Sequence, residues 1–128
     1  MNMNHYKIIT SWVEFNKRYP NIEDWEWKED ISKHVWGNIS WNWFHLLAIN
    51  YRPNNYETTF NKILKFIHKL PCQTCREHAL EYIVIFMPDL TNSKHFQKWV
   101  WKFHNTVNFK LNKKLITYDD YKKLYNLY

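Results

Sequence analysis

The residues best suited to chemistry are two cysteines, Cys72 and Cys75, the only ones in the chain. A C-x-x-C pair either ligates a metal or exchanges disulfides with other thiols. Pro71 directly before the pair predicts that a helix begins there, and N–H groups at a helix N-terminus stabilise a thiolate. Arg76 adds positive charge within one turn. These features favour a redox-active dithiol, with thiolate available for exchange.

Zinc binding is the alternative chemistry for this pair. A structural zinc site usually takes four Cys or His ligands. Cys72, Cys75 and His78 supply three, but a second C-x-x-C or paired-histidine motif is missing. His45, His68 or His104 could supply a fourth ligand. A c-type haem is excluded, because Arg76 stands where its ligand histidine would follow the second cysteine.

A second group of chemistry-bearing residues lies in the periodic segment 94–111. Trp101, His104, Asn105 and Asn108 recur at helical spacing, on a different face from the apolar stripe. Asn is mildly unfavourable inside a helix, so this face is a candidate hydrogen-bonding wall for a polar ligand. On spacing alone, a solvated face or a buried histidine with capping amides is the commoner explanation. A similar cluster occurs earlier, at Trp41, Phe44, His45 and Ala48.

The elements that must position these residues are helices. Apolar periodicity predicts helices over residues 4–18, 40–51, 56–70, from the cysteines to about 86, and 94–111. Thr117 and Asp120 form a capping box that predicts a short final helix. Residues 21–35 are predicted to be a linker with one short helix. Short joints between helices predict an antiparallel bundle, a fold that builds ligand sites between facing helices.

Composition narrows the classes of function. The 128 residues suit one domain, and the single glycine excludes glycine-rich phosphate loops. The net charge of +6 is spread along the chain, as on a solvated surface, and could also serve a phosphate-bearing cofactor. No apolar run reaches about 18 residues, so no membrane span is expected. The first residues lack the apolar region of a signal peptide, which predicts a cytosolic protein, where structural disulfides are rare.

Three blocks resemble, in order and spacing, the Erv/ALR family of FAD-linked sulfhydryl oxidases. They read WGNISWNWFHLLAINY (36–51), LPCQTC (70–75) and FQKWVWKFHNTVNFKLNKK (96–114). The matching positions are Gly37, Trp41, His45, Pro71, Cys72, Cys75, Phe96, Trp99, His104, Asn105, Val107, Asn108, Leu111 and Lys113. The joint pattern is far more specific than any one block. A small chain with so few cysteines is most similar to members carried by large cytoplasmic DNA viruses.

The resemblance implies an all-α fold: a four-helix bundle with a short fifth helix over residues 36–128, and an N-terminal helical extension over 1–35. FAD is then expected at one end of the bundle. His104 and Tyr125 would sandwich the adenine. The other cofactor-binding positions implied are Asn105, Asn108 and Lys113 for the ribose and pyrophosphate, Gly37, Trp41 and His45 around the flavin, and Tyr51, His78, Trp101, Val107 and Leu111.

The function implied is thiol oxidation: Cys72 and Cys75 pass electrons from a thiol-containing protein, or from a thioredoxin-like carrier, through FAD to oxygen. No metal or nucleic acid is needed. The family resemblance also implies a homodimer, located in the host cytoplasm or the virion. Two departures stand out, because Trp101 and Tyr118 replace the cysteines of a bracing disulfide, and Asn38 replaces an arginine.

Two other classes of function stay open at this point. A zinc-stabilised helical module could bind nucleic acid through its positive charge, and would be colourless with salt-dependent binding. A structural or adaptor protein could keep a degenerate oxidase fold without flavin. The retention of both cysteines beside the His-Asn pattern argues against the adaptor.

Overall fold

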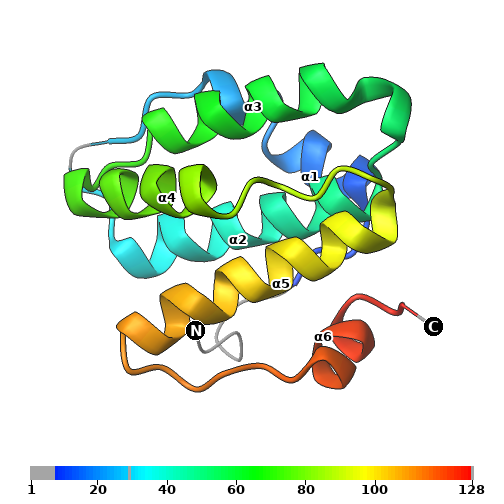
Figure 1. Ribbon diagram of the computed structural model, residues 1–128. Helices are drawn as coiled ribbons and strands as arrows, with labels where there is room; N and C mark the ends of the chain where they lie inside the picture. The colour runs from blue at the N-terminus through cyan, green and yellow to red at the C-terminus, as the bar shows by residue number, and fades with distance from the viewer. Residues whose placement is uncertain (1–7, 29, 128) are drawn as a thin grey trace.

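The computed structural model of the chain describes residues 8–28 and 30–127, and within them it contains α-helices, short 3-10 helices and no strand (Figure 1). The α-helices are α1 (Trp12–Arg18), α2 (Lys33–Ile49), α3 (Tyr56–His68), α4 (Gln73–Ile85), α5 (Ser93–Lys110) and α6 (Tyr118–Leu124). The 3-10 helices are η1 (Ile22–Asp24) and η2 (Pro53–Asn55). The predicted all-α class is confirmed, with α2 to α5 as the four long helices and α6 as the short fifth.

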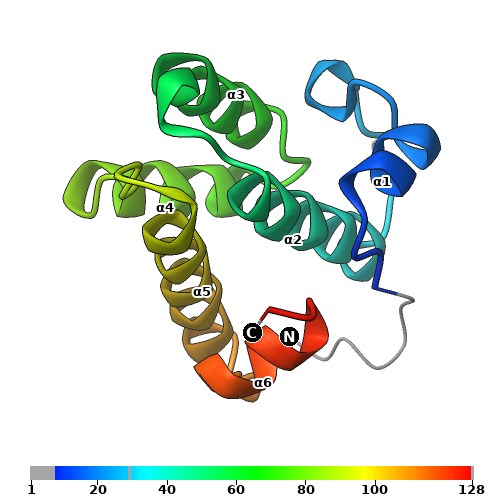
Figure 2. The same cartoon turned by 90° about the vertical axis from the view of Figure 1, so that its right-hand side faces the viewer.

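The central helix of the bundle is α2, which packs most extensively against α5. Figures 1 and 2 place α3 and α6 at opposite ends of the molecule, with α2 and α5 between them. A helix enclosed in this way must be apolar on nearly all sides. The second half of α2 meets that requirement with an unbroken buried run, Trp43, Phe44, His45, Leu46, Leu47 and Ala48.

The start of α2 differs from the prediction. The helix begins at Lys33 rather than near Ser40, inside the segment predicted to be a linker. Ser32 caps it, since its Oγ accepts a hydrogen bond from the backbone N–H of His34 at 3.2 Å. Gly37 and the three residues before it, His34, Val35 and Trp36, conceal this first part of the helix, because their intrinsic helix preference is weak. Burial of Trp36 against the core stabilises it instead.

The first helix is shorter than predicted. Ser11 caps α1 by accepting from the backbone N–H of Glu14 at 3.3 Å, so the helix begins at Trp12 and the chain from Ile8 to Thr10 is not helical. Residues 4–7 of the predicted helix lie outside the described residues. A serine side chain that bonds to the backbone N–H three residues later favours a helix start over a helix interior, which explains the later beginning.

The other helices agree with the sequence pattern to within two residues at each end. The cap of α6 is also as predicted, because Thr117 Oγ1 accepts from the backbone N–H of Asp120 at 3.1 Å. No helix of the described residues is long and apolar enough to cross a membrane.

The N-terminal segment shares the core of the bundle. Ile9, Phe15 and Ile22 are buried and belong to the same apolar cluster as α2 to α5. Lys65 on α3 pairs with Asp24 in η1, and Trp25 Nε1 donates to the carbonyl of Pro20 at 2.8 Å. The predicted division between residues 35 and 36 falls inside α2 and stays a prediction.

Replacing Phe15 tests how firmly this segment is attached. Its ring is fully buried, stacks on Trp12 and makes a tilted contact with Tyr19. We expect Phe15→Ala to lower the free energy of unfolding by about 3–5 kcal/mol, through lost burial and the cavity left behind. Val13→Ala, on the exposed side of the same helix, should change it by less than about 0.5 kcal/mol. Urea titration measures both, and a Phe15→Ala effect as small as that of Val13→Ala would show that the Phe15 ring contributes nothing to the core.

Candidate functional site

The two cysteines are joined as a disulfide at the N-terminus of α4. Cys72 is the N-cap residue, and its Sγ accepts a hydrogen bond from the backbone N–H of Cys75 at 3.2 Å. The predicted helix start at this pair is therefore confirmed. The stabilising N–H group faces Cys72 rather than Cys75.

Arg76 lies beside the disulfide and is half-buried. Its guanidinium donates a hydrogen bond to the carbonyl oxygen of Leu70. This contact joins the first turn of α4 to the chain before Pro71. Arg76 thus holds the turn that carries Cys72, besides supplying positive charge there.

The disulfide lines a cavity of about 270 Å³ between α2, α4 and α5. Aromatic rings form one wall, where Phe103 contacts Tyr82 with ring centroids 4.7 Å apart and Trp41 at 5.2 Å. Both cysteines and seven of the predicted cofactor-binding residues line this cavity: Gly37, Trp41, His78, Val107, Asn108, Leu111 and Lys113. Three sequence blocks that are far apart in the chain therefore meet at one site.

Two features of the cavity wall are suited to a flat polar ligand. Gly37 leaves space, because a Cβ atom built there would meet no heavy atom within 4 Å beyond its local helix. Asn38 is buried, and its Nδ2 donates to the carbonyl oxygen of His34. Its Oδ1 is buried without a hydrogen-bond partner among the described residues. A buried acceptor of this kind is costly unless something donates to it.

Behind the cavity wall lies a buried histidine pair, His45 and His104. His45 Nε2 and His104 Nδ1 are 2.9 Å apart, and the His104 ring stacks on Trp41 with centroids at 4.0 Å. Burial lowers the pKa of His45 to about 3. Burial also lowers the pKa of His104, with a smaller contribution from His45. Both rings are therefore neutral, and one donates N–H while the other accepts. Neither residue is among those that line the cavity.

Three predicted cofactor-binding residues make contacts elsewhere. Trp101 Nε1 and Asn105 Nδ2 donate to the carbonyl oxygen of Ile116, at 2.7 and 2.8 Å. The hydroxyl of Tyr125 donates to Asn42 Oδ1 at 3.0 Å, and its ring lies 5.2 Å from that of His45. His104 was predicted to pair with Tyr125 around the adenine, and in the structure its ring stacks on Trp41. The structure therefore assigns Trp101 and Asn105 contacts between α5 and the segment that leads to α6.

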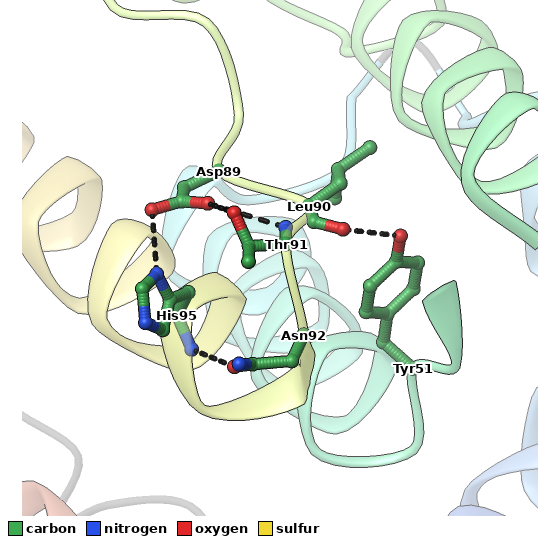
Figure 3. Close-up of polar contacts among 6 residues, drawn as sticks. All are labelled: Tyr51, Asp89, Leu90, Thr91, Asn92 and His95. Carbon is green, nitrogen blue, oxygen red and sulfur yellow. Dashed lines mark hydrogen bonds and ion pairs between the residues drawn. The ribbon is translucent and has the colours of Figure 1, made fainter. Parts of the chain in front are cut away.

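Tyr51 also lies away from the cavity, at the joint between α4 and α5. Its hydroxyl donates to the carbonyl oxygen of Leu90 at 2.7 Å (Figure 3). In the same joint, Asp89 accepts from Thr91 Oγ1 at 2.6 Å and lies 3.1 Å from His95 Nδ1. Hydrogen bonds to Thr91 lower the pKa of Asp89. These contacts give Tyr51 a role in holding the chain between the two helices.

Several cavity residues were missed by the sequence reasoning. Tyr82 follows Cys75 by two helical turns, so spacing along α4 alone would have placed both on one face. Lys33 was missed because the start of α2 was predicted too late. No feature of the sequence around Thr106 would have predicted that it lines the cavity.

The zinc alternative loses its ligands in this arrangement. Both thiols are engaged in the disulfide. Across residues 8–28 and 30–127, no group of three or more His, Cys, Asp or Glu side chains is placed to hold a metal ion. The two sulfurs are thus bonded to each other and not placed as metal ligands.

Comparison with known proteins agrees with this geometry. The model of the Erv1 / Alr family matches residues 38–126, which include the disulfide, all of α5 and most of α2. The chain belongs to the Erv1/Alr family. It is 44% identical over 95 residues to the FAD-linked sulfhydryl oxidase of African swine fever virus isolate Pig/Kenya/KEN-50/1950, covering 70% of this chain and 79% of the relative.

Similar proteins occur both in a plant and in a second isolate of the same virus. The FAD-linked sulfhydryl oxidase ERV1 of Arabidopsis thaliana is 29% identical over 87 residues, covering 65% of this chain and 46% of that protein. A second African swine fever virus protein of the same description, from isolate Tick/Malawi/Lil 20-1/1983, is 42% identical, again over 70% of this chain and 79% of the relative.

The histidine pair predicts how stability depends on pH. An unfolded chain protonates histidine near pH 6.5, whereas folded His45 resists protonation down to about pH 3. The unfolded state therefore binds more protons in between, and the free energy of unfolding should fall by about 1.4 kcal/mol per pH unit for each such histidine below about pH 6. Urea titration between pH 4 and 8 measures this slope.

The variant His45→Gln should reduce the slope. Val100→Ala, a core change that removes no titratable group, should lower stability at every pH and keep the slope. An unchanged slope in His45→Gln would show that the pair is not responsible.

Proposed function

We propose that this protein is an FAD-linked sulfhydryl oxidase that joins thiols of protein substrates into disulfides and passes the electrons to oxygen. The observation that carries the proposal is the Cys72–Cys75 disulfide, which opens into a cavity lined by family-pattern residues from α2 and α5. A dithiol alone lacks an efficient two-electron route to oxygen, and a flavin supplies one.

The cavity residues fit the flavin part of FAD. The isoalloxazine ring is flat, and the aromatic wall with the space at Gly37 suits such a ring. Its pyrimidine edge carries an N–H donor, and the buried Oδ1 of Asn38 is an acceptor without a protein partner. These features support binding of the ring by Gly37, Asn38 and Trp41.

The charges at the cavity fit the diphosphate part of FAD. Lys33, Lys110 and Lys113 line it, and none of the described lining residues is Asp or Glu. Clustered ammonium groups offset phosphate charge. Asn108, buried on the same helix as Lys110, is placed to contribute hydrogen bonds.

The disulfide performs the exchange with substrate. A substrate thiolate attacks Cys72 Sγ, the Cys72–Cys75 bond breaks, and Cys75 leaves as a thiolate. A second substrate thiol then attacks the substrate sulfur of the mixed disulfide and releases Cys72. The substrate has lost two electrons and two protons, and the cysteine pair has gained them. FAD, when bound, supplies the route by which this electron pair reaches oxygen, which becomes hydrogen peroxide.

The helix N-terminus favours the second of these steps. The backbone N–H of Cys75 points at Cys72 Sγ, so it stabilises the Cys72 thiolate as that sulfur is released. A better stabilised leaving group departs faster. The N–H contact therefore supports Cys72 as the sulfur that carries the substrate.

The proposal also covers the substrate, the oligomeric state and the location of the protein. The substrate is a thiol-containing protein or a thioredoxin-like carrier, which must reach the half-exposed disulfide directly. The protein acts as a homodimer, as family resemblance implies, and light scattering of the purified chain tests this. It works in the host cytoplasm or the virion, in keeping with its viral relatives.

Replacement of Cys75 tests the role of the disulfide. Cys75→Ser should keep the yellow colour of bound flavin, because the cavity is otherwise intact, and should reduce oxygen consumption with dithiothreitol by at least about 100-fold. Val84→Ser, an exposed change at the far end of α4, should have wild-type activity. Undiminished oxidation by Cys75→Ser would refute the assignment, and a colourless wild-type protein would refute the flavin.

Replacement of Gly37 separates its ligand role from its structural role. Gly37→Ala adds a methyl group that meets no clash, so α2 should gain up to about 1 kcal/mol of stability from higher helix preference. The same methyl group occupies space needed by the ring, so flavin should be released faster. Thermal melting and flavin fluorescence measure the two effects.

The opposite change, Ala48→Gly, provides the control. Ala48 is buried in α2 away from the cavity, so this variant should lose stability and keep its flavin release rate. A Gly37→Ala protein with unchanged flavin release would show that no ring lies close to Gly37.

A further inference from the structure

Three side-chain hydrogen bonds converge on the backbone of Ile116, in the segment 111–117 that joins α5 to α6. Trp101 Nε1 and Asn105 Nδ2 both donate to its carbonyl oxygen, at 2.7 and 2.8 Å. Its N–H donates to Asn105 Oδ1 at 2.9 Å. The Asn105 amide thus satisfies both backbone groups of one residue. We name Trp101, Asn105 and Ile116 the Ile116 clamp.

The clamp determines where α6 begins. Thr117 caps the helix directly after Ile116, and the ring of Tyr118 packs against Trp101 with centroids 5.3 Å apart. The ammonium groups of Lys98 and Lys122 lie 5.5 and 5.2 Å from the centre of the Tyr118 ring. The start of α6 is therefore attached to the middle of α5 by hydrogen bonds, ring packing and cation–π contacts.

The attached helix closes over the buried histidine pair. Tyr121 and Tyr125 are buried, and their rings lie 4.9 and 5.2 Å from the ring of His45. His45 contacts His104, which stacks on Trp41 in the cavity wall. Contacts thus run without a break from the clamp through α6 to the cavity.

The helix depends on this attachment. A seven-residue helix has little stability by itself, because nucleation costs more than so few hydrogen bonds return. Its position must come from tertiary contacts, and the Ile116 clamp supplies such contacts directly before the helix begins.

We propose that Asn105 is a positioning residue: through Ile116 and α6 it holds the histidine pair and Trp41 in place, and so controls how tightly FAD is retained without touching it. This inference rests on the proposed function. It replaces the expectation that Asn105 binds the ribose or the pyrophosphate. The bidentate amide explains why asparagine stands inside this helix, where it is otherwise unfavourable.

The test measures flavin release from the purified holoenzyme, as the rise in flavin fluorescence after dilution. Asn105→Leu removes both hydrogen bonds and should speed release about tenfold at every pH, the effect of losing one to two half-buried hydrogen bonds. The rate of reduction of the Cys72–Cys75 disulfide by dithiothreitol should be unchanged, because the disulfide lies at the start of α4, away from the clamp.

A second variant provides a pH-dependent signature. Asn105→Asp keeps the acceptor for the Ile116 N–H. Its second oxygen faces the Ile116 carbonyl, which it repels as a carboxylate and bonds as a neutral acid. Relative to wild type at the same pH, release should be fast at pH 8 and approach the wild-type rate only as the pH falls below about 4, where an ordinary Asp carboxyl becomes neutral. Asn61→Leu and Asn61→Asp, at an exposed site on α3, are matched controls that should release flavin at the wild-type rate.

A milder variant covers the case in which Asn105→Leu does not fold. Trp101→Phe keeps a ring against Tyr118 and removes one donor, so release should be faster than wild type and slower than in Asn105→Leu.

The outcomes separate this inference from the proposed function. Wild-type release by all clamp variants, or an Asn105→Asp rate that does not slow as pH falls, would overturn the positioning role and leave the oxidase intact. A wild-type protein that neither holds flavin nor oxidises thiols would overturn the proposed function, and this inference with it.

Discussion

The contact between the imidazole rings of His45 and His104 connects the two helices on which the site depends. It joins α2 to α5 at 2.9 Å inside the core, and it places Trp41 at the cavity wall by ring stacking. Two polar rings can be buried together only if each is neutral and one serves the other as donor. Burial enforces neutrality by lowering both pKa values. The pair therefore aligns the central helices more specifically than apolar packing would.

At the other side of the cavity, backbone hydrogen bonds at the start of α4 position the disulfide. Cys72 takes the N-cap position of α4, where other proteins use a serine or aspartate oxygen, and its sulfur accepts the N–H of Cys75. Arg76 secures the preceding turn through the carbonyl of Leu70. One helix end thus both fixes the geometry of the cysteine pair and stabilises a thiolate. The rings of Phe103 and Tyr82, in contact with each other, line the same cavity as the disulfide.

Much of the fold could be predicted from the chain. The apolar stripe over 94–111 and the capping box at Thr117 are local signals, and both helices appear where expected. The start of α2 could not be predicted, because Gly37 and the residues His34 and Val35 have weak helix preference, for which burial of Trp36 compensates. Likewise, Ser11 begins α1 later than periodicity indicates, since capping outweighs an apolar pattern at Ile8 and Ile9.

The sequence by itself determined the chemistry: a dithiol at a helix start, a glycine and a tryptophan one turn apart on α2, and lysines after Asn108. These depend on residue type and short spacing, which the chain carries directly. Only the tertiary structure decided which polar residues face the cavity and which act as braces. Asn105 and Asn108 lie three residues apart on α5, one helical turn from each other. Asn105 nevertheless bonds to the backbone of Ile116, whereas Asn108 lines the cavity. The physical reason is that a side chain takes the partner that folding brings within hydrogen-bond distance, and that partner comes from a segment whose position no local pattern specifies.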